Sequence, residues 1–321
     1  MKKRRIIFVL IAGIILIFSS GGCGEKSKTK EKQNANSKSE ITPEQNVITH
    51  EIKMMPKLPK ENTLKVTNSS KWVKILSYHI VMPEAEIKRN SIVRFTKASD
   101  LALVTPLESF EKQLEYISKN FKVVKFSDFA KRLETKEEYD RNAVILSFDG
   151  ADECFYKYTY PAMKKYSMPS VLFLYVNSVK LDKTAMKWET IKKLHEEGLV
   201  EIESHTITHP HLGRRINGES DEKYRARVRF ELSESKKIVE EKLIKKVYYF
   251  AYPYGSYNSE VIEMLKETGY KAAVTVQWDR NTVNSNPFTL KRRTVVGTFN
   301  MKKFIEIFDS NASQDNREFA D

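Results

Sequence analysis

Apolar and polar positions divide this chain into three parts. An apolar run, Ile6 to Phe18, follows four positive charges at residues 2–5. Residues 24–46 then contain almost no large apolar side chain, whereas apolar runs recur from about residue 72 to about residue 308. This pattern predicts a signal segment, a flexible tether and one folded domain.

Within the folded part, strand-like runs alternate with helical periodicity. The run Ala143 to Phe148 is continuously apolar, as in a strand buried on both faces. Repeated strand–helix units of this spacing imply a parallel sheet, and this many strands imply a closed or nearly closed α/β barrel. The other predicted strands are Val73–His79, Ser170–Tyr175, Val200–Glu203, Tyr248–Ala251 and Ala272–Val276, and the predicted helices are Ser109–Asn120, Tyr160–Tyr166, Lys187–Glu197, Tyr224–Glu241, Ser259–Thr268 and one beginning at Met301.

The segment before the tether resembles a bacterial lipoprotein signal. Small residues, Ser19 to Gly22, directly precede Cys23, as in a lipobox, although a leucine is usual where Ser20 stands. We therefore expect lipidation of Cys23, with a plain cleaved signal or an uncleaved anchor as alternatives. The expected divisions are a signal peptide (1–22), a lipidated tether (23–70), a barrel (71–310) and a tail (311–321).

Charge and cysteine content narrow the function classes. The 321 residues include 55 Lys and Arg against 42 Asp and Glu, a net charge of +13. Such a surplus fits an anionic membrane surface, cell-wall polymer or nucleic acid, but no nucleic-acid-binding motif accompanies it, so we expect no nucleic-acid partner. If Cys23 is lipidated, Cys154 has no intrachain partner, and we expect it to be a small apolar helix residue.

Chemistry in a parallel barrel lies at the carboxyl ends of its strands. Polar residues directly follow apolar runs at four places: 78–79, 147–152, 203–209 and 250–255. His205 and His209 are four residues apart, so their imidazoles can face the same way, and imidazole is a preferred ligand of zinc. The pair therefore indicates a metal site.

The last three of these segments resemble, in order, the motifs of the polysaccharide deacetylases, carbohydrate esterases with a nodulation-deacetylase homology domain. Trp188 to His209 resembles the second motif with its preceding helix, and Phe250 to Gly255 resembles a third motif in which alanine replaces the usual arginine. The resemblance covers most of residues 72–308. It implies a distorted (β/α)7 TIM-like barrel and a divalent metal, zinc first, with cobalt or nickel as alternatives.

The resemblance makes His205 and His209 metal ligands and Asp149 the general base. The first motif departs from the family pattern, which has two adjacent aspartates, base then ligand, because Gly150 follows Asp149 here. Three readings stay open. Asp152 reaches the metal instead, or Asp149 becomes a ligand and another group is the base, or metal binding and activity are lost.

The general acid of this family usually comes from a histidine late in the chain, and residues 290–294 contain none. Ile75 to His79 instead resembles the opening of the subgroup that deacetylates poly-β-1,6-N-acetylglucosamine, which supplies this histidine from the N-terminal side. His79 would then protonate the leaving amine; a structural histidine at a strand end is the alternative.

A sugar groove is also expected beside these groups. Flat aromatic rings stack on pyranose faces, although a core position for each ring is the competing interpretation. The candidate groove residues are Tyr252, Pro253, Tyr254 and Trp278.

These features favour a metal-dependent hydrolase that removes N-acetyl groups from an N-acetylglucosamine-containing polymer. It would act as a monomer, anchored to a membrane of the cell envelope on its extracytoplasmic side. A catalytically inactive barrel that binds polysaccharide is the main alternative, and a hydrolase of another amide or ester in the same fold is a third.

Overall fold

The computed structural model describes residues 70–90 and 98–309. The predicted signal peptide, Cys23, most of the tether and the tail lie outside these residues. None of the described helices combines the length and apolar composition that crossing a bilayer requires.

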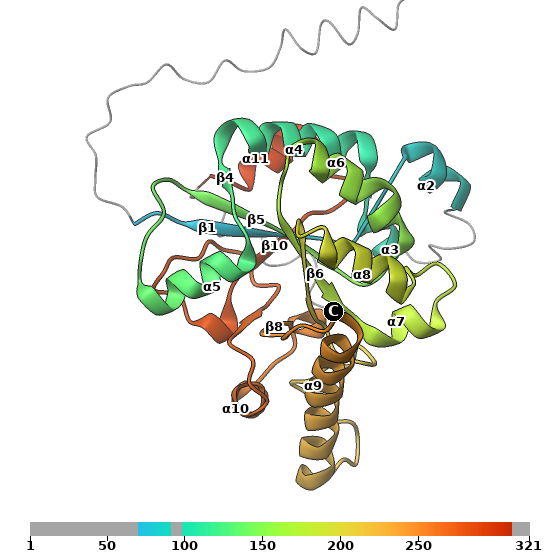
Figure 1. Cartoon of the computed structure of the whole chain (residues 1–321), viewed down its shortest axis with the longest axis vertical. Coiled ribbons are helices and arrows are strands. Elements are labelled where there is room, and N and C mark those ends of the chain that lie inside the picture. Colours follow the sequence, from blue (N-terminus) through green and yellow to red (C-terminus); the bar gives the residue numbers. More distant parts are fainter. Residues whose placement is uncertain (1–69, 91–97, 310–321) are drawn as a thin grey trace, which may run out of the picture. The chain divides into compact units, whose positions relative to one another are not determined.

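A parallel sheet forms the centre of the described fold (Figure 1). Its strands follow the order β10-β1-β5-β6-β7-β8-β9, and all adjacent pairs are parallel. Val274 in β9 also forms a parallel bridge with Leu290, just before β10, so the sheet is nearly closed into a barrel. The strands are β1 (Val73–Tyr78), β5 (Ala143–Asp149), β6 (Ser170–Leu174), β7 (Val200–Ser204), β8 (Tyr249–Ala251), β9 (Ala272–Val274) and β10 (Arg292–Thr294), with β4 (Lys122–Val123) paired to β5.

Helices surround this barrel and cover the outward faces of its strands. The longest, α9, begins after Ser220, whose hydroxyl accepts a hydrogen bond from Lys223 N, and it extends beyond the sheet (Figure 1). The main helices are α4 (Leu107–Asn120), α5 (Phe126–Thr135), α6 (Tyr160–Lys165), α8 (Trp188–Glu196), α9 (Asp221–Leu243), α10 (Ser259–Glu267) and α11 (Met301–Glu306). Shorter elements are α2 (Glu84–Asn90), α3 (Ala98–Ala102), α7 (Val176–Leu181), a π-helix (Phe155–Thr159) and a separate pair of strands, β2 (Ile80–Met82) and β3 (Val104–Pro106).

Side chains alternate between two cores along each strand. Ile75, Ile145 and Phe173 belong to a cluster inside the barrel, which Phe126 and Phe129 of α5 also fill. Their chain neighbours, such as Leu76 and Leu146, belong to the larger cluster between sheet and helices. This two-residue period decides which residues at the strand ends point toward the barrel axis.

The predicted fold class is confirmed: the described residues form an α/β barrel with a parallel sheet. The predicted strands and helices match observed elements within a few residues. The sequence interpretation missed α5, β10, the π-helix and the short elements α2, α3, α7, β2, β3 and β4. Cys154 is 4% exposed and packs with Met82 and Val104, as expected of a small apolar residue.

Candidate active site

Three of the predicted site residues come together at the carboxyl edge of the barrel. Asp149 ends β5, while His79 and His205 directly follow the residues that end β1 and β7. Each lies an even number of residues beyond an interior position of its strand, so alternation favours an inward direction. The charge of Asp149 acts on both imidazoles, which brings the three groups into one electrostatic unit.

Asp149 is bound by a buried arginine that the sequence interpretation did not single out. Arg292 of β10 is fully buried and donates from Nη1 to Oδ1 at 2.7 Å and from Nη2 to Oδ2 at 2.8 Å. Burial alone would raise the pKa of Asp149, but the Arg292 guanidinium, followed by His205, holds that pKa well below its usual range. The carboxylate is therefore ionised and fixed in orientation.

His205 and His209 face each other. Their Nε2 atoms are 3.0 Å apart, and His205 Nε2 lies 3.9 Å from Asp149 Oδ2. His205 Nδ1 is 2.7 Å from the carbonyl oxygen of Ala251, a contact in which Nδ1 donates and Nε2 keeps its lone pair. Such a backbone partner is the usual way in which a metal-binding imidazole is oriented.

The loop that carries these imidazoles has an unusual backbone. Thr206 has φ +69° and His209 has φ +59°, and a positive φ is rare for a β-branched residue. Thr206 Oγ1 accepts a hydrogen bond from His209 N at 3.0 Å, which closes the turn. Backbone strain of this kind persists where surrounding contacts hold it, and it is frequent at functional sites.

Glu231 of α9 supplies those contacts. Its carboxylate is 3% exposed and accepts hydrogen bonds from Ile207 N at 2.8 Å and Thr208 N at 3.0 Å, as well as from the Thr208 hydroxyl. Three donors from the segment between the two histidines thus converge on one buried side chain. Glu231 positions the loop without reaching the imidazoles themselves.

The two imidazoles fit a divalent metal ion. Burial lowers the pKa of His205 to about 3 and also lowers that of His209, so both rings are neutral near pH 7. The neutral imidazole is the form that coordinates zinc. A third ligand is not in place, because no three His, Cys, Asp or Glu side chains among the described residues are arranged to hold a metal ion.

Asp152 does not form a three-residue metal-binding group with this pair among the described residues. Its Oδ1 accepts a hydrogen bond from Cys154 N at 2.9 Å, and its backbone forms an antiparallel bridge with Ala185. Gly150, where the resemblance leads us to expect an aspartate, has φ +110°, a conformation that L side chains rarely adopt. The backbone therefore disfavours an aspartate at residue 150, and Asp152 as third ligand stays a prediction.

His79 has an imidazole nitrogen without a protein partner. Its Nδ1 is buried and forms no hydrogen bond among the described residues. Burial lowers the pKa of His79, Asp149 raises it, and Arg292 and His209 lower it. Because buried polar atoms are usually hydrogen-bonded, this unsatisfied nitrogen marks His79 as a candidate functional residue.

Tyr252 occupies a core position, the competing interpretation for this residue, and does not line a groove. Its side chain is fully buried, stacks on Tyr257 and donates its hydroxyl to the carbonyl oxygen of Phe288 at 3.0 Å, so it belongs to the core. Pro253 is buried as well. The physical reason is that Tyr252 directly follows β8, where alternation turns the ring toward the outer core.

Tyr254 and Trp278 are accessible. Tyr254 is 59% exposed, and its ring packs edge-on against His209 with centroids 4.6 Å apart. The exposed His211 stacks on the same ring at 4.2 Å. Trp278 is half-buried, and the Arg293 guanidinium lies over its ring at 3.2 Å. Tyr254 is thus the aromatic candidate whose contact with the histidine pair is direct.

Sequence comparison supports the family resemblance. Residues 136–273 match the family model described as polysaccharide deacetylase. This part of the chain is therefore similar to the polysaccharide deacetylases, a class of hydrolases. It is 27% identical over 225 residues to a poly-β-1,6-N-acetyl-D-glucosamine N-deacetylase of Staphylococcus aureus, a match that covers 68% of this chain and 76% of the relative.

Solved structures share the fold. The Streptococcus pyogenes deacetylase PplD, in complex with acetate, aligns with a TM-score of 0.63 at 20% identity over 75% of this chain and 100% of that one. IcaB from Ammonifex degensii aligns with a TM-score of 0.60 at 20% identity, over 74% and 96% of the two chains. These matches support the barrel architecture alone.

Proposed function

We propose that this protein is a metal-dependent N-deacetylase that acts on an N-acetylglucosamine-containing polymer of the cell envelope. The observation that carries the proposal is the meeting of His205 and His209 with Asp149 at the carboxyl edge of the barrel. The substrate class is supported by the Staphylococcus aureus relative, whose name specifies poly-β-1,6-N-acetyl-D-glucosamine.

The reaction is hydrolysis of an acetamide. A water oxygen attacks the acetyl carbon, the C–N bond breaks, and acetate and a free sugar amine leave. Asp149, kept ionised and oriented by Arg292, takes a proton from the attacking water. His79 delivers a proton to the leaving nitrogen, a role that its unsatisfied buried Nδ1 supports.

His205 and His209 would hold the divalent ion, with zinc as the first candidate and cobalt or nickel as alternatives. When bound, the ion polarises the amide carbonyl and lowers the pKa of water. The side chain that completes the ligand set remains open between Asp149 and Asp152. An Asp152→Asn variant that binds zinc as tightly as the parent excludes Asp152.

The site of action follows from the N-terminal segment. Lipidation of Cys23 would place the barrel outside the cytoplasm on a tether, with Tyr254 and Trp278 accessible to a polymer. Metabolic labelling with a clickable fatty acid tests this, because a label that persists in a Cys23→Ala variant contradicts lipidation at this residue.

Acetate release tests the activity. The purified full chain would be incubated with β-1,4- and β-1,6-linked N-acetylglucosamine oligomers, with and without zinc, cobalt or nickel. We expect metal-stimulated release that is lost in Asp149→Asn and His205→Ala variants. Absence of release with every oligomer and metal would instead favour a polysaccharide-binding role, which the missing aspartate at Gly150 supports.

A further inference from the structure

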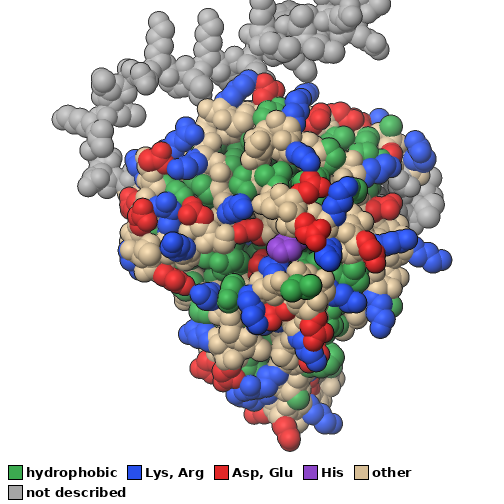
Figure 2. Space-filling model, in the orientation of Figure 1, with side chains coloured by type: hydrophobic (Ala, Val, Ile, Leu, Met, Phe, Trp, Pro, Cys, Tyr) green, Lys and Arg blue, Asp and Glu red, His purple; other side chains and the backbone are tan. Residues whose placement is uncertain are grey.

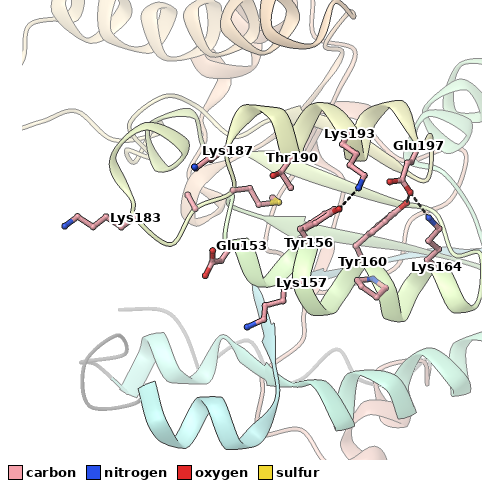
Figure 3. A pocket seen from close by; sticks show the side chains of 13 residues that line it. Glu153, Tyr156, Lys157, Tyr160, Lys164, Lys183, Lys187, Thr190, Lys193 and Glu197 are labelled. Carbon is pink, nitrogen blue, oxygen red and sulfur yellow. Dashed lines mark hydrogen bonds and ion pairs between the residues drawn. The ribbon is translucent and has the colours of Figure 1, made fainter. Parts of the chain in front are cut away.

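A hollow of about 740 Å³ lies outside the candidate active site, between the π-helix with α6 on one side and α8 with the loop that leads into it on the other (Figure 3). Its volume falls within the range of roughly 300–1,000 Å³ that is common for ligand sites. Five lysines and two glutamates line it, a net charge of +3; the lysines are Lys157, Lys164, Lys183, Lys187 and Lys193.

This charge differs from the general surface. Figure 2 shows basic and acidic side chains interspersed over the viewed face of the molecule. Two of the five lysines are already paired: Lys164 Nζ lies 2.7 Å from Glu197 Oε2, and Lys157 Nζ lies 3.5 Å from Oε1 of Glu86, which is not part of the lining. Lys183 and Lys187 are exposed and form no ion pair within the described part of the chain. The end of the hollow near these two lysines therefore attracts anions.

Neutral groups in the hollow suit a sugar. Tyr156 and Tyr160 lie side by side with rings 8° from parallel, and their hydroxyls meet Lys193 and Glu197 (Figure 3). Pro161 and Ala185 add apolar surface for the C–H face of a pyranose. Tyr160 is only 5% exposed, so its ring offers no open face for stacking, either to a nucleic-acid base or to a pyranose.

Backbone hydrogen bonds connect the loop beside the hollow to the segment that follows Asp149. Met186 N donates to the carbonyl oxygen of Ala151 at 2.7 Å, and Glu153 N donates to that of Thr184 at 2.8 Å. The loop that carries Lys183 and Lys187 is thereby joined to the residues that directly follow Asp149 and Gly150. The end of the hollow near Lys183 and Lys187 therefore lies close to the carboxyl edge of the barrel, which carries the candidate active site.

We propose that this hollow is a binding site for a carboxylated glycan, whose ring carboxylates contact Lys183 and Lys187. The site retains the protein on an anionic polymer and is separate from the deacetylase activity. The proposal is tested by binding alone, so its outcome does not depend on whether the protein is an active deacetylase.

The test is a calorimetric titration of the full chain with a hexamer of galacturonic acid, which carries a carboxylate on every ring and no acetamide. We expect saturable binding that weakens as salt rises, and no binding of the neutral cellohexaose. Lys183→Ala/Lys187→Ala should bind about fivefold more weakly. Glu153→Gln, which removes a repelling carboxylate from the lining, should bind more tightly.

The matched control is Lys223→Ala/Lys242→Ala, which removes two exposed lysines from α9 and should leave affinity unchanged. Thermal unfolding of each variant verifies that the fold persists. Equal affinity of the Lys183/Lys187 variant and the control would overturn the proposal. So would equal or tighter binding of poly(glycerol phosphate) or of a single-stranded oligonucleotide of the same charge.

Discussion

Arg292 and Asp149 form a two-pronged ion pair inside the barrel, with both guanidinium Nη atoms within 2.8 Å of the carboxylate. The side chains are 0% and 7% exposed. Because both charged groups are largely removed from solvent, each depends on the other for stabilisation. The pair also joins β5 to the last strand of the sheet.

Removal of one member of this pair should be costly. We expect Arg292→Met to lower the free energy of unfolding by about 3–5 kcal/mol, because it leaves a buried carboxylate unpaired. Urea denaturation measures the loss. The double variant Asp149→Asn/Arg292→Met should be more stable than the sum of the two single losses predicts. Additive losses would show that the two charges are not coupled.

The adjacent arginine is the control for this experiment. Arg293 lies over the half-buried ring of Trp278 and not in the barrel interior. Arg293→Met should therefore cost about 1 kcal/mol or less.

Glu231 should affect metal affinity through the loop that it holds. Glu231→Gln replaces one acceptor oxygen by an NH2 group that faces backbone donors, so the segment between His205 and His209 loosens. We expect zinc affinity to fall about tenfold, measured by competition with a chromogenic chelator. Glu234→Gln, one turn later on α9 and paired only weakly with Lys237, should bind zinc like the parent. An unchanged affinity in Glu231→Gln would contradict the positioning role.

Gly150 should tolerate substitution poorly although space is available. A Cβ at residue 150 would meet no atom within 4 Å, so the penalty comes from its φ of +110°. We expect Gly150→Ala to destabilise the protein by about 2–3 kcal/mol. Gly198→Ala, equally unobstructed but at φ +75°, should cost about 1 kcal/mol. Equal losses in thermal unfolding would contradict this explanation.

Lys74 should make stability depend on pH. Its side chain is 8% exposed, donates to the carbonyl oxygen of Ile307 and lies near Trp72 and Phe308. Burial, followed by repulsion from Arg280, lowers its pKa to about 8, whereas the unfolded value is about 10.4. Between these values the unfolded chain binds more protons than the folded one, so this residue's contribution to stability improves as pH rises.

The variant Lys74→Met should remove this dependence. Below pH 8 the free energy of unfolding of Lys74→Met should exceed that of the parent by the largest amount. This difference should fall by about 2–3 kcal/mol as pH rises to about 10.5. Urea titrations at several pH values measure the difference, and Lys242→Met is the control for loss of an exposed charge. A difference that stays constant with pH would contradict the shifted pKa.

The barrel could be predicted because its buried strands are long apolar runs. Ala143 to Phe148 is one such run, and its alternation with helical segments indicates a parallel sheet. The strand β10 escaped prediction because it is three residues long and begins with two arginines, a composition typical of a surface segment. Arg292 was therefore missed as a site residue. The position of residues 292–294 after the last predicted strand–helix unit could have indicated one more strand.

The remaining differences between prediction and structure arise from contacts that form only when the chain folds. Tyr252 and Tyr254 are both aromatic and both follow β8, yet one is fully buried and the other is 59% exposed. Their identities alone do not reveal this, because Tyr254 lies in a 3-10 turn with a positive φ, where the alternation of the strand no longer applies. Glu231 lies on a mostly polar helix where a buried carboxylate has no sequence signature, since its partners are backbone amides.

The bridge from Val274 to Leu290, followed by the pairing of β10 with β1, has a consequence for synthesis. During translation β1 emerges first, but one of its edges stays unpaired until residues 292–294 arrive near the end of the chain. A ribosomal product that stops before Leu290 would leave open edges on both β1 and β9, which invite pairing with other chains. Such a fragment would also lack the cation for Asp149, so premature termination yields an aggregation-prone protein and not a weakened enzyme.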